Sequence, residues 1–283
     1  MIVNPAPLGI AASDAWRIIA AVDGRSLQRY ARIVVLDLSE VRRTSGQRHP
    51  WEIARVRALS TILRRRQVRI ESILDVGCGD GFIGESLRNM LGARALVGID
   101  AHLPDTECGI LRAADHVIER YPSDRSIGDR RFDLVLALDV IEHVDDDRAL
   151  VDDVVSHWTT PGGLVLVTVP AFQSLFSHHD LALRHHRRYN HAQLRTLLEG
   201  AGLAILEDGY LFASLVAPRA LAVLGERLGF QQDDHGVGSW EGPPWLAQLI
   251  AATLTLDAEA LLAATRLGIR VPGLTAWALC AAQ

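Results

Sequence analysis

Residues 73–84 read ILDVGCGDGFIG, and this stretch decides the fold. It begins as an apolar strand, passes through a glycine-rich turn and continues as the start of an amphipathic segment. Glycine lets the backbone turn sharply and approach a ligand closely. Asp75 stands at the end of the strand, where a carboxylate can accept hydrogen bonds from a cationic or hydroxyl-bearing ligand. The stretch therefore predicts a strand–turn–helix unit with a ligand site at the turn.

Short apolar runs alternate with amphipathic segments on both sides of this turn. The alternation indicates a mostly parallel sheet that helices cover on both faces, and such sheets bind ligands beyond the carboxyl ends of their strands. The runs predict strands at residues 72–76, 95–99, 115–120, 132–138 and 163–169, with helices at 82–91, 147–158 and 192–199.

The two flanks of the chain have a different character. Residues 1–70 are predicted to form a helical cap, with helices at 13–21 and 51–66. Residues 71–283 are predicted to form the ligand-binding domain. Within this domain, residues 211–272 form a helical insertion or lid, since long insertions are usually functional. The insertion is expected to hold helices at 211–228 and 245–264, a loop at 231–244, and flanking strands at 204–210 and 274–281.

The composition excludes several classes of function. All 29 basic residues other than histidine are arginine, which excludes a phosphate-loop lysine, a lysine Schiff base and a Tyr-x-x-x-Lys pair. A net charge of −5 argues against nucleic-acid binding. Three scattered cysteines, Cys78, Cys108 and Cys280, predict a reducing compartment, the cytoplasm. No transmembrane segment is expected, since the longest uncharged apolar run covers only residues 242–256.

Two cofactors compete for the glycine turn. Asp100 ends the second predicted strand, where an acid suits the hydroxyls of a ribose. Residues 79–84 match the G-x-G-x-x-G pattern of nicotinamide-dinucleotide enzymes, but the turn already opens at Gly77. Asp75 and Asp80 would also repel a pyrophosphate. A ligand with an amino group, a ribose and no phosphate fits better, and S-adenosylmethionine is such a ligand.

The run from Asp75 to Gly81 resembles the glycine-rich motif of class I S-adenosylmethionine-dependent methyltransferases, of the small-molecule type 11/12 kind. Residues 132–144 (FDLVLALDVIEHV) and 161–170 (PGGLVLVTVP) resemble the family's fourth and fifth strands. The resemblance implies a Rossmann-like, doubly wound α/β fold with a seven-stranded sheet. Its last strand is antiparallel, N-terminal helices precede the sheet, and a helical insertion precedes the last strand.

The resemblance also implies a set of cofactor-binding residues. The glycines lie under the methionine and ribose moieties, Asp100 binds the ribose, and Ala101 lines the adenine pocket. Either Ser123 or Asp124 takes the place of the acid that contacts adenine. The complete set is Asp75, Gly77, Cys78, Gly79, Gly81, Asp100, Ala101, Ser123, Asp139 and Val140.

His143 follows the fourth predicted strand, close to where the transferred methyl group should lie. Histidine can act as a base near neutral pH, so His143 is predicted to accept a proton or to orient the acceptor. A structural brace at the start of a helix is the alternative. A divalent cation held by Glu142 and His143, as in some relatives with this segment, is a lesser alternative, and no metal is assigned.

A second concentration of candidates lies between residues 178 and 191, where five of the eleven histidines fall. A cluster of this kind can hold an anionic group. One alternative is that Arg187 or Arg188 braces a carboxylate. Another is a zinc site at residues 178–180. The predicted catalytic residues here are His178, His179, His186 and Tyr189, and the predicted substrate-binding residues are Arg187, Arg188 and the distant Trp51.

The sequence therefore predicts a cytoplasmic methyltransferase that uses S-adenosylmethionine on a small, partly apolar acceptor, with or without an anionic end. The sequence leaves open which atom of the acceptor is methylated, whether the protein forms a homodimer, and whether it contacts a membrane surface. The alternatives are a same-fold enzyme with a non-methylating reaction such as cyclisation, a nicotinamide-dependent oxidoreductase, and a membrane-surface or binding protein.

Overall fold

The computed structural model describes residues 48–229 and 242–283. All of these residues belong to one compact unit, Ile33–Gln283. The helix predicted at residues 13–21 and most of the loop predicted at residues 231–244 lie outside the described residues.

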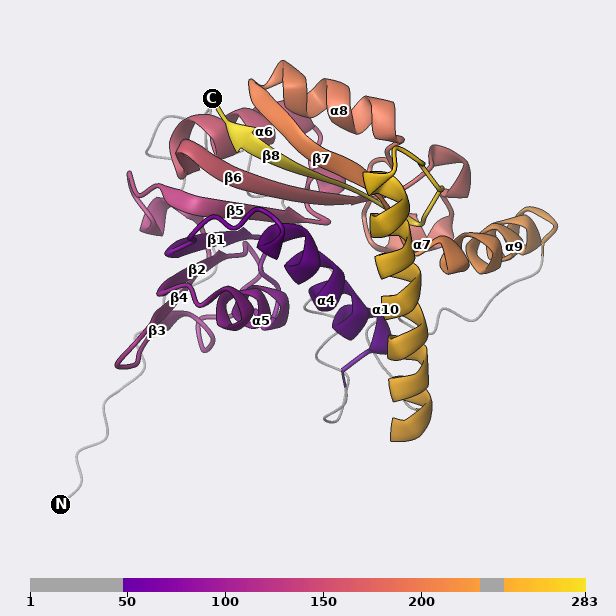
Figure 1. Cartoon of the computed structure of the whole chain (residues 1–283), viewed down its shortest axis with the longest axis horizontal. Coiled ribbons are helices and arrows are strands. Elements are labelled where there is room, and N and C mark those ends of the chain that lie inside the picture. Colours follow the sequence, from indigo (N-terminus) through magenta and orange to yellow (C-terminus); the bar gives the residue numbers. More distant parts are fainter. Residues whose placement is uncertain (1–47, 230–241) are drawn as a thin grey trace, which may run out of the picture. The chain divides into compact units, whose positions relative to one another are not determined.

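The strands form a single mixed sheet with the order β3-β4-β2-β1-β5-β6-β8-β7 (Figure 1). Strands β4, β2, β1, β5 and β6 are parallel to one another, whereas β8 lies antiparallel between β6 and β7. This order confirms the predicted doubly wound fold with an antiparallel last strand. The strands are β1 (Ser72–Val76), β2 (Ala95–Ile99), β3 (Gly109–Arg112), β4 (Val117–Tyr121), β5 (Phe132–Leu138), β6 (Thr159–Pro170), β7 (Leu203–Leu211) and β8 (Thr275–Ala282).

The number of strands corrects the prediction, because the sheet has eight strands and not seven. The additional strand is β3, which pairs antiparallel with β4 at the edge of the sheet. All four of its residues are exposed. A strand without a buried face lacks the alternation of apolar and polar residues by which strands are predicted from sequence.

Most of the α-helices begin and end within two residues of their predicted bounds, but the helix predicted at residues 211–228 begins only at Val216, and the five-residue helix His178–Ala182 was not predicted. Helix α6 continues directly into a π-helical turn, Val154–Trp158, and short 3-10 turns connect other elements at Asp124–Ser126, Ile141–His143 (η2), Gln173–Leu175 and Ala213–Leu215. The α-helices are α4 (Pro50–Arg64), α5 (Phe82–Leu91), α6 (Asp147–Asp153), α7 (His178–Ala182), α8 (His191–Gly200), α9 (Val216–Arg227) and α10 (Pro244–Arg266).

Helices cover both faces of the sheet (Figure 1). Helices α4, α5 and α10 pack on one face, where Ile62, Leu87 and Leu262 join the core with Leu134 of β5. Helices α6 and α8 pack together on the other face. Burial of both faces explains why β1, β2 and β5 read as continuous apolar runs. The arrangement leaves the carboxyl edge of the parallel strands to the connecting loops, where ligands bind in folds of this kind.

Helix α10 is longer than the predicted apolar run. With 23 residues and a mean hydropathy of 1.5 in its most apolar window, it is long and apolar enough to cross a membrane by length and composition. The uncharged apolar run ends at residue 256 because Asp257 and Glu259 follow it. In the structure, Asp257 accepts hydrogen bonds from Ser214, and Glu259 accepts one from Thr61 of α4. These contacts join α10 to the rest of the domain.

Candidate active site

The glycine turn follows β1 and is fixed to the end of β2. The backbone N–H groups of Gly77 and Cys78 both donate to the carbonyl oxygen of Ile99, at 2.8 and 3.2 Å. Gly77 has a φ of +69°, and a β-carbon there would lie 2.7 Å from a methyl group of Val140. Gly81, with a φ of +83°, precedes the first turn of α5. Glycine is therefore required at Gly77, and the turn exposes bare backbone where a ligand can approach.

Arg120 of β4 reaches across β2 to the glycine turn. Its guanidinium donates to the carbonyl oxygen of Gly79 at 3.0 Å and lies against Gly81. The path crosses Gly98 of β2, where an added β-carbon would lie 2.8 Å from the sulfur of Cys78. The absence of a side chain at Gly98 thus lets Cys78 and Arg120 pack beneath the turn. Burial and nearby carboxylates raise the pKa of the Cys78 thiol, which makes Cys78 a packing residue.

Asp100 links the end of β2 to the same turn. One carboxylate oxygen accepts a hydrogen bond from the Gly79 N–H at 3.0 Å, and the other accepts one from the His102 N–H at 2.8 Å. Each carboxylate oxygen has a further lone pair. Asp100 can therefore shape the turn and still accept hydrogen bonds from the hydroxyls of a bound ligand.

Asp75 is buried at the end of β1, and its carboxylate lies where a β-carbon on Gly84 of α5 would be. Burial raises the pKa of Asp75 to about 7, against the opposing effect of the Arg55 charge. The ionised form of Asp75 therefore lacks full compensation in this structure. A positively charged ligand at the turn would supply it.

The neighbouring strands β5 and β6 end at an ion pair in which the arginine is buried and the aspartate is half-buried. Arg55 of α4 lies 2.7 Å from the carboxylate of Asp139 and donates to the hydroxyl of Thr168 at 2.8 Å. Asp139 has a φ of +56°, which is unusual for a residue other than glycine. The guanidinium of Arg55 also lies 4.9 Å from the ring centre of Trp51, one turn earlier in α4. Helix α4 thus contributes a cation and an aromatic ring to this edge of the sheet.

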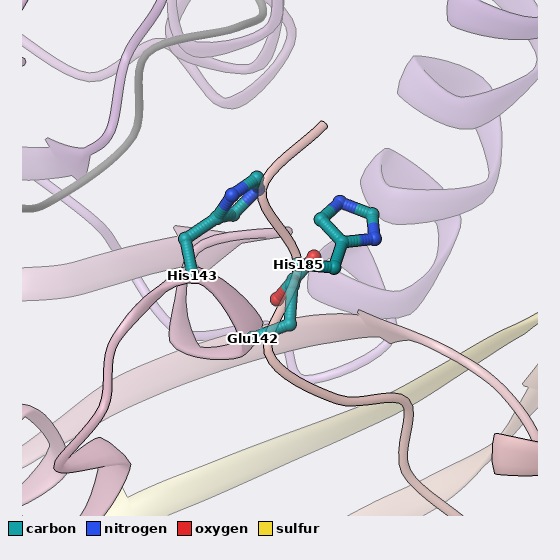
Figure 2. Close-up of side chains that lie close together, drawn as sticks. All are labelled: Glu142, His143 and His185. Carbon is teal, nitrogen blue, oxygen red and sulfur yellow. The ribbon is translucent and has the colours of Figure 1, made fainter. Parts of the chain in front are cut away.

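His143 ends η2, the turn that follows β5, and it faces a second histidine. The ring centres of His143 and His185 are 4.5 Å apart in an edge-to-face arrangement. Figure 2 shows that the side chain of Glu142 lies beside both rings. Burial, together with His185 and His186, lowers the pKa of His143 to about 3. His143 is therefore neutral near pH 7.

The comparison with protein families identifies the domain. The sequence pattern of the methyltransferase domain family matches residues 27–208, which is more than half of the chain. The chain belongs to this family. Membership confirms the predicted enzyme class and, with it, the predicted cofactor of the family, S-adenosylmethionine.

Curated relatives are similar over part of their length. The mitochondrial ubiquinone biosynthesis O-methyltransferase of Dictyostelium discoideum is 32% identical over 112 residues, which covers 34% of this chain and 34% of that protein. The ubiquinone biosynthesis O-methyltransferase of Chelativorans sp. is 33% identical over 100 residues, which covers 34% of this chain and 38% of that protein. The matches thus span little more than a third of these relatives.

Solved structures are similar at low identity. A SAM-dependent methyltransferase from Archaeoglobus fulgidus is 17% identical with a TM-score of 0.41, and the match covers 80% of this chain and 94% of that chain. An O-methyltransferase family protein from Burkholderia thailandensis is 16% identical with a TM-score of 0.41, and the match covers 56% of this chain and 54% of that chain.

The residues of the methyltransferase domain fit the cofactor of the family. A β-carbon at Gly77 would collide with Val140, and one at Gly81 would collide with Arg120, so both positions keep the backbone of the turn bare. Asp100 retains lone pairs for a ribose diol, and the raised pKa of Asp75 suits a cationic ligand nearby. The sequence predicted these residues for the cofactor, and the structure brings them together at one edge of the sheet.

The other predicted cofactor residues lie around this centre. Val140 is buried against Gly77, whereas Ala101 is exposed just beyond Asp100. Ser123 is half-buried immediately before the turn Asp124–Ser126. Their contacts with adenine or methionine remain predictions.

Residues 178–191 divide into a buried network and an exposed surface. Asp180 accepts hydrogen bonds from Arg188 at 2.7 Å, from Arg219 at 2.8 Å and from His185 at 2.9 Å. Although burial opposes ionisation, these partners hold the pKa of Asp180 far below its usual range. Tyr189 is buried and donates to Asp147, and burial together with this bond raises its pKa. Arg188 thus braces a carboxylate, which was the alternative to its predicted substrate contact.

The remaining histidines of this stretch are directed elsewhere. His178 is 82% exposed beside Glu226, and Nδ1 of His186 lies 2.9 Å from a carboxylate oxygen of Asp145. His179 lies half-buried in α7. Arg187 pairs with Asp147 at 2.8 Å. None of these contacts includes a residue of the glycine turn, so the catalytic and substrate roles of these residues remain predictions.

A surface hollow of about 590 Å³ lies on the side of α8. Its lining includes Asp147, Arg187, Tyr189 and Gln193, and no residue of the glycine turn. Since methyl transfer requires the acceptor beside the cofactor, we do not assign the acceptor to this hollow.

Sequence reasoning missed three residues that the fold brings to the site. Arg55 and Arg120 reach it from α4 and β4, and His185 reaches it from the segment after α7. Each is far in sequence from its partner, so no local motif marks it. One signal for Arg120 was available. Arg120 is in register with Gly98 on the adjacent strand, and a glycine there leaves room for a long side chain to cross β2.

Proposed function

We propose that this domain transfers a methyl group from S-adenosylmethionine to a small, partly apolar acceptor through a hydroxyl oxygen of that acceptor. The observation that carries the proposal is the meeting of two features at one edge of the sheet. The first is the glycine turn held by Asp100 and Arg120, and the second is the turn η2 with His143 after the neighbouring strand β5.

Oxygen is favoured as the methylated atom by the curated relatives, whose printed names are ubiquinone biosynthesis O-methyltransferases. The apolar part of the acceptor is supported by exposed apolar side chains on the insertion. They are Leu221 and Leu224 of α9 and Trp245, Leu249 and Leu256 of α10.

Bound S-adenosylmethionine supplies an electrophilic methyl carbon on a positively charged sulfur. The protein must then align an acceptor oxygen with that carbon, because in-line geometry accounts for much of the rate of such a displacement. His143 is neutral and buried beside the end of β5, so it can orient the acceptor through a hydrogen bond. Its low pKa favours this orienting role over the storage of a proton.

The test begins with the cofactor. Purified protein is titrated by calorimetry with S-adenosylmethionine, S-adenosylhomocysteine and NAD. Binding of the first two without NAD is expected, whereas binding of NAD alone would refute the proposal in favour of an oxidoreductase. If none of the three ligands bound, the presence of a competent cofactor site would be refuted.

The second step identifies the reaction. A panel of hydroxylated aromatic compounds with and without apolar tails is incubated with the cofactor, and the products are analysed by mass spectrometry. Methyl transfer adds one methyl group and releases S-adenosylhomocysteine, whereas cyclisation leaves the mass of the acceptor unchanged. His143→Ala should lower turnover about 10-fold or more while cofactor affinity is retained, and unchanged turnover would remove His143 from the mechanism.

A membrane-surface role is the second candidate, favoured by the same exposed apolar residues on α9 and α10. Sedimentation with liposomes tests it, with Leu221→Ser and Trp245→Ser as the variants. Loss of sedimentation in these variants would support it, and the absence of sedimentation of the unaltered protein would exclude it.

A further inference from the structure

Helix α10 exposes an apolar stripe along its whole length. Its inner face packs against α4 and β7 (Figure 1). Leu256 and Leu267 on the outer face are 72% and 77% exposed, which makes them the two most exposed large apolar residues that the structure describes. The complete stripe consists of seven exposed residues, Trp245, Leu249, Ala252, Leu256, Ala260, Ala263 and the C-cap residue Leu267. At a rise of 1.5 Å per residue it is about 33 Å long.

The stripe is narrow, and its width indicates what it contacts. At 100° per residue, all seven residues lie within about 40° of Leu256 around the helix axis. Apolar residues that recur at intervals of three and four in so narrow a stripe are typical of a helix that packs against another helix. Helices that lie on a membrane have arginine or lysine on the polar face. Helix α10 has neither before Arg266, and it carries Asp257 and Glu259 instead. A helical partner is therefore favoured over a lipid surface.

The stripe is symmetric about Leu256. Its other members lie four, seven and eleven positions before and after this residue, and all of them are apolar. A second α10 that runs antiparallel about a two-fold axis at Leu256 would therefore meet the first along the whole stripe, as an isologous contact requires. The pairs across the axis would be Leu256–Leu256, Ala252–Ala260, Leu249–Ala263 and Trp245–Leu267. Alanine on one or both sides of two of these pairs lets the helices approach closely.

The outer face of α10 can be removed from water at little cost. The hydroxyl of Thr253, which is exposed beside the stripe, donates to the carbonyl oxygen of Leu249 at 2.9 Å and so has a partner within the helix. Among the charged residues of α10 only Arg266, at the end of the helix, is exposed. The seven residues of the stripe present roughly 700 Å² of surface, close to the area of about 800 Å² that each partner buries in a stable interface.

We propose that the protein forms a homodimer in which the α10 helices of two copies pair antiparallel along this stripe. The contact does not rest on the proposed function. Leu221 and Leu224 of α9 are not part of the stripe, so they remain available to an acceptor or to a membrane. Since Glu259 of α10 accepts a hydrogen bond from Thr61 of α4, the dimer would also support the helix that carries Arg55 to the candidate active site.

The mass of the full chain in solution tests the proposal. Analytical ultracentrifugation at about 1–100 µM should show twice the monomer mass at the higher concentrations. Leu256→Arg places two like charges together on the axis and should weaken dimerisation about 100-fold or more. Leu221→Arg is the matched control, because this leucine of α9 is 69% exposed but lies outside the stripe, so dimerisation should be unchanged. Circular dichroism and thermal unfolding verify that both variants fold.

An exchange of charges tests the antiparallel register. Leu249→Glu and Ala263→Arg should each weaken the dimer about 10-fold or more, because each places two charges in an apolar contact. The double variant should recover most of this loss, because each glutamate then faces an arginine of the second copy. Parallel helices would instead bring the two glutamates together. If the double variant dimerised no better than the single variants, the antiparallel pairing would be wrong.

A monomer at every concentration would overturn the proposal, as would a dimer that Leu256→Arg leaves unchanged. Sedimentation with liposomes separates the first of these results further. If the monomeric protein bound to liposomes and Leu256→Arg did not, the stripe would be a membrane contact. Titration with S-adenosylmethionine is done separately, so a dimer that fails to bind the cofactor would refute the proposed function and leave the dimer in place.

Discussion

A guanidinium nitrogen of Arg55 lies 2.7 Å from the carboxylate of Asp139 and 2.8 Å from the hydroxyl of Thr168. This contact joins α4, which precedes the sheet in the chain, to the carboxyl ends of β5 and β6. Since Asp139 follows β5 immediately and η2 follows Asp139, the ion pair fixes the point from which His143 projects. The position of α4 is therefore coupled to the geometry of the candidate active site.

Replacement of Arg55 by methionine should destabilise the protein. Arg55 is buried, and its removal leaves Asp139 without its charge partner, which costs about 3 kcal/mol for a pair of this kind. Urea unfolding measures the change. Arg57→Met is the matched control, because Arg57 lies on the exposed side of the same helix and should change the stability by less than about 0.5 kcal/mol.

The double variant Arg55→Met, Asp139→Asn tests the cause. If the ion pair carries the effect, the double variant should be more stable than Arg55→Met alone, because the uncompensated carboxylate has been removed. Equal or lower stability of the double variant would place the effect in the packing of Arg55 against Trp51.

The affinity for S-adenosylmethionine should rise with pH through about 7. The folded protein holds the proton of Asp75 up to that pH, above the ordinary value of 3.8, because burial disfavours the carboxylate. A cationic cofactor favours the ionised form, so binding below pH 7 must release a proton. The same shift means that the contribution of Asp75 to stability falls as pH rises from about 4 to 7. The charged groups around Asp75 are Arg55, Asp100, Arg120 and Asp80.

Calorimetry between pH 6 and pH 8, in buffers of different ionisation enthalpy, measures both the affinity and the proton release. Asp75→Asn should bind with a flat pH profile and without proton release. A pH dependence that persists in this variant would assign the titration to another of the surrounding groups.

The sequence predicted the elements that are encoded locally. Strands β1, β2 and β5 begin and end where the apolar patterns predicted, because each is a continuous apolar run with both faces buried. Helix α5 also has its predicted bounds, because its amphipathic pattern lies between the glycine turn and Gly92. The glycine turn was also predictable from local sequence, because the glycines that its backbone conformation requires lie within a few residues of one another. The exposed strand β3 left no such pattern.

The partners of the site depended on tertiary packing and were not predictable from local sequence. Of the neighbours Arg187 and Arg188, the second is buried on Asp180 and the first pairs with Asp147. Residue type and spacing alone do not distinguish them. Similarly, five histidines lie within residues 178–191, but the pairing of His185 with His143 is fixed by where η2 and α7 end.

Asp100→Ala should weaken the binding of S-adenosylmethionine by roughly 1–3 kcal/mol, the cost of unpaired hydrogen-bonding groups. Two groups lose their acceptor at once, namely the Gly79 N–H in the turn and the hydroxyl of the ligand. Calorimetric titration measures the affinity. The affinity of Asp100→Asn, which retains one acceptor oxygen, should lie between those of the unaltered protein and of Asp100→Ala. Unchanged affinity of Asp100→Ala would remove Asp100 from the cofactor site.

Gly98→Ala should destabilise the protein by about 1–3 kcal/mol, although alanine is elsewhere the better strand residue. The new β-carbon would lie 2.8 Å from the sulfur of Cys78, directly beneath the glycine turn, so the turn must shift and cofactor affinity should fall with stability. Gly225→Ala is the matched control. A β-carbon at this position in α9 meets nothing within 4 Å, and removal of a helical glycine should stabilise the protein by about 0.5–1 kcal/mol. Thermal unfolding and calorimetric titration of both variants measure these effects. If Gly98→Ala retained both its stability and its cofactor affinity, the close packing of Cys78 and Arg120 beneath the turn would not be what holds the turn in place.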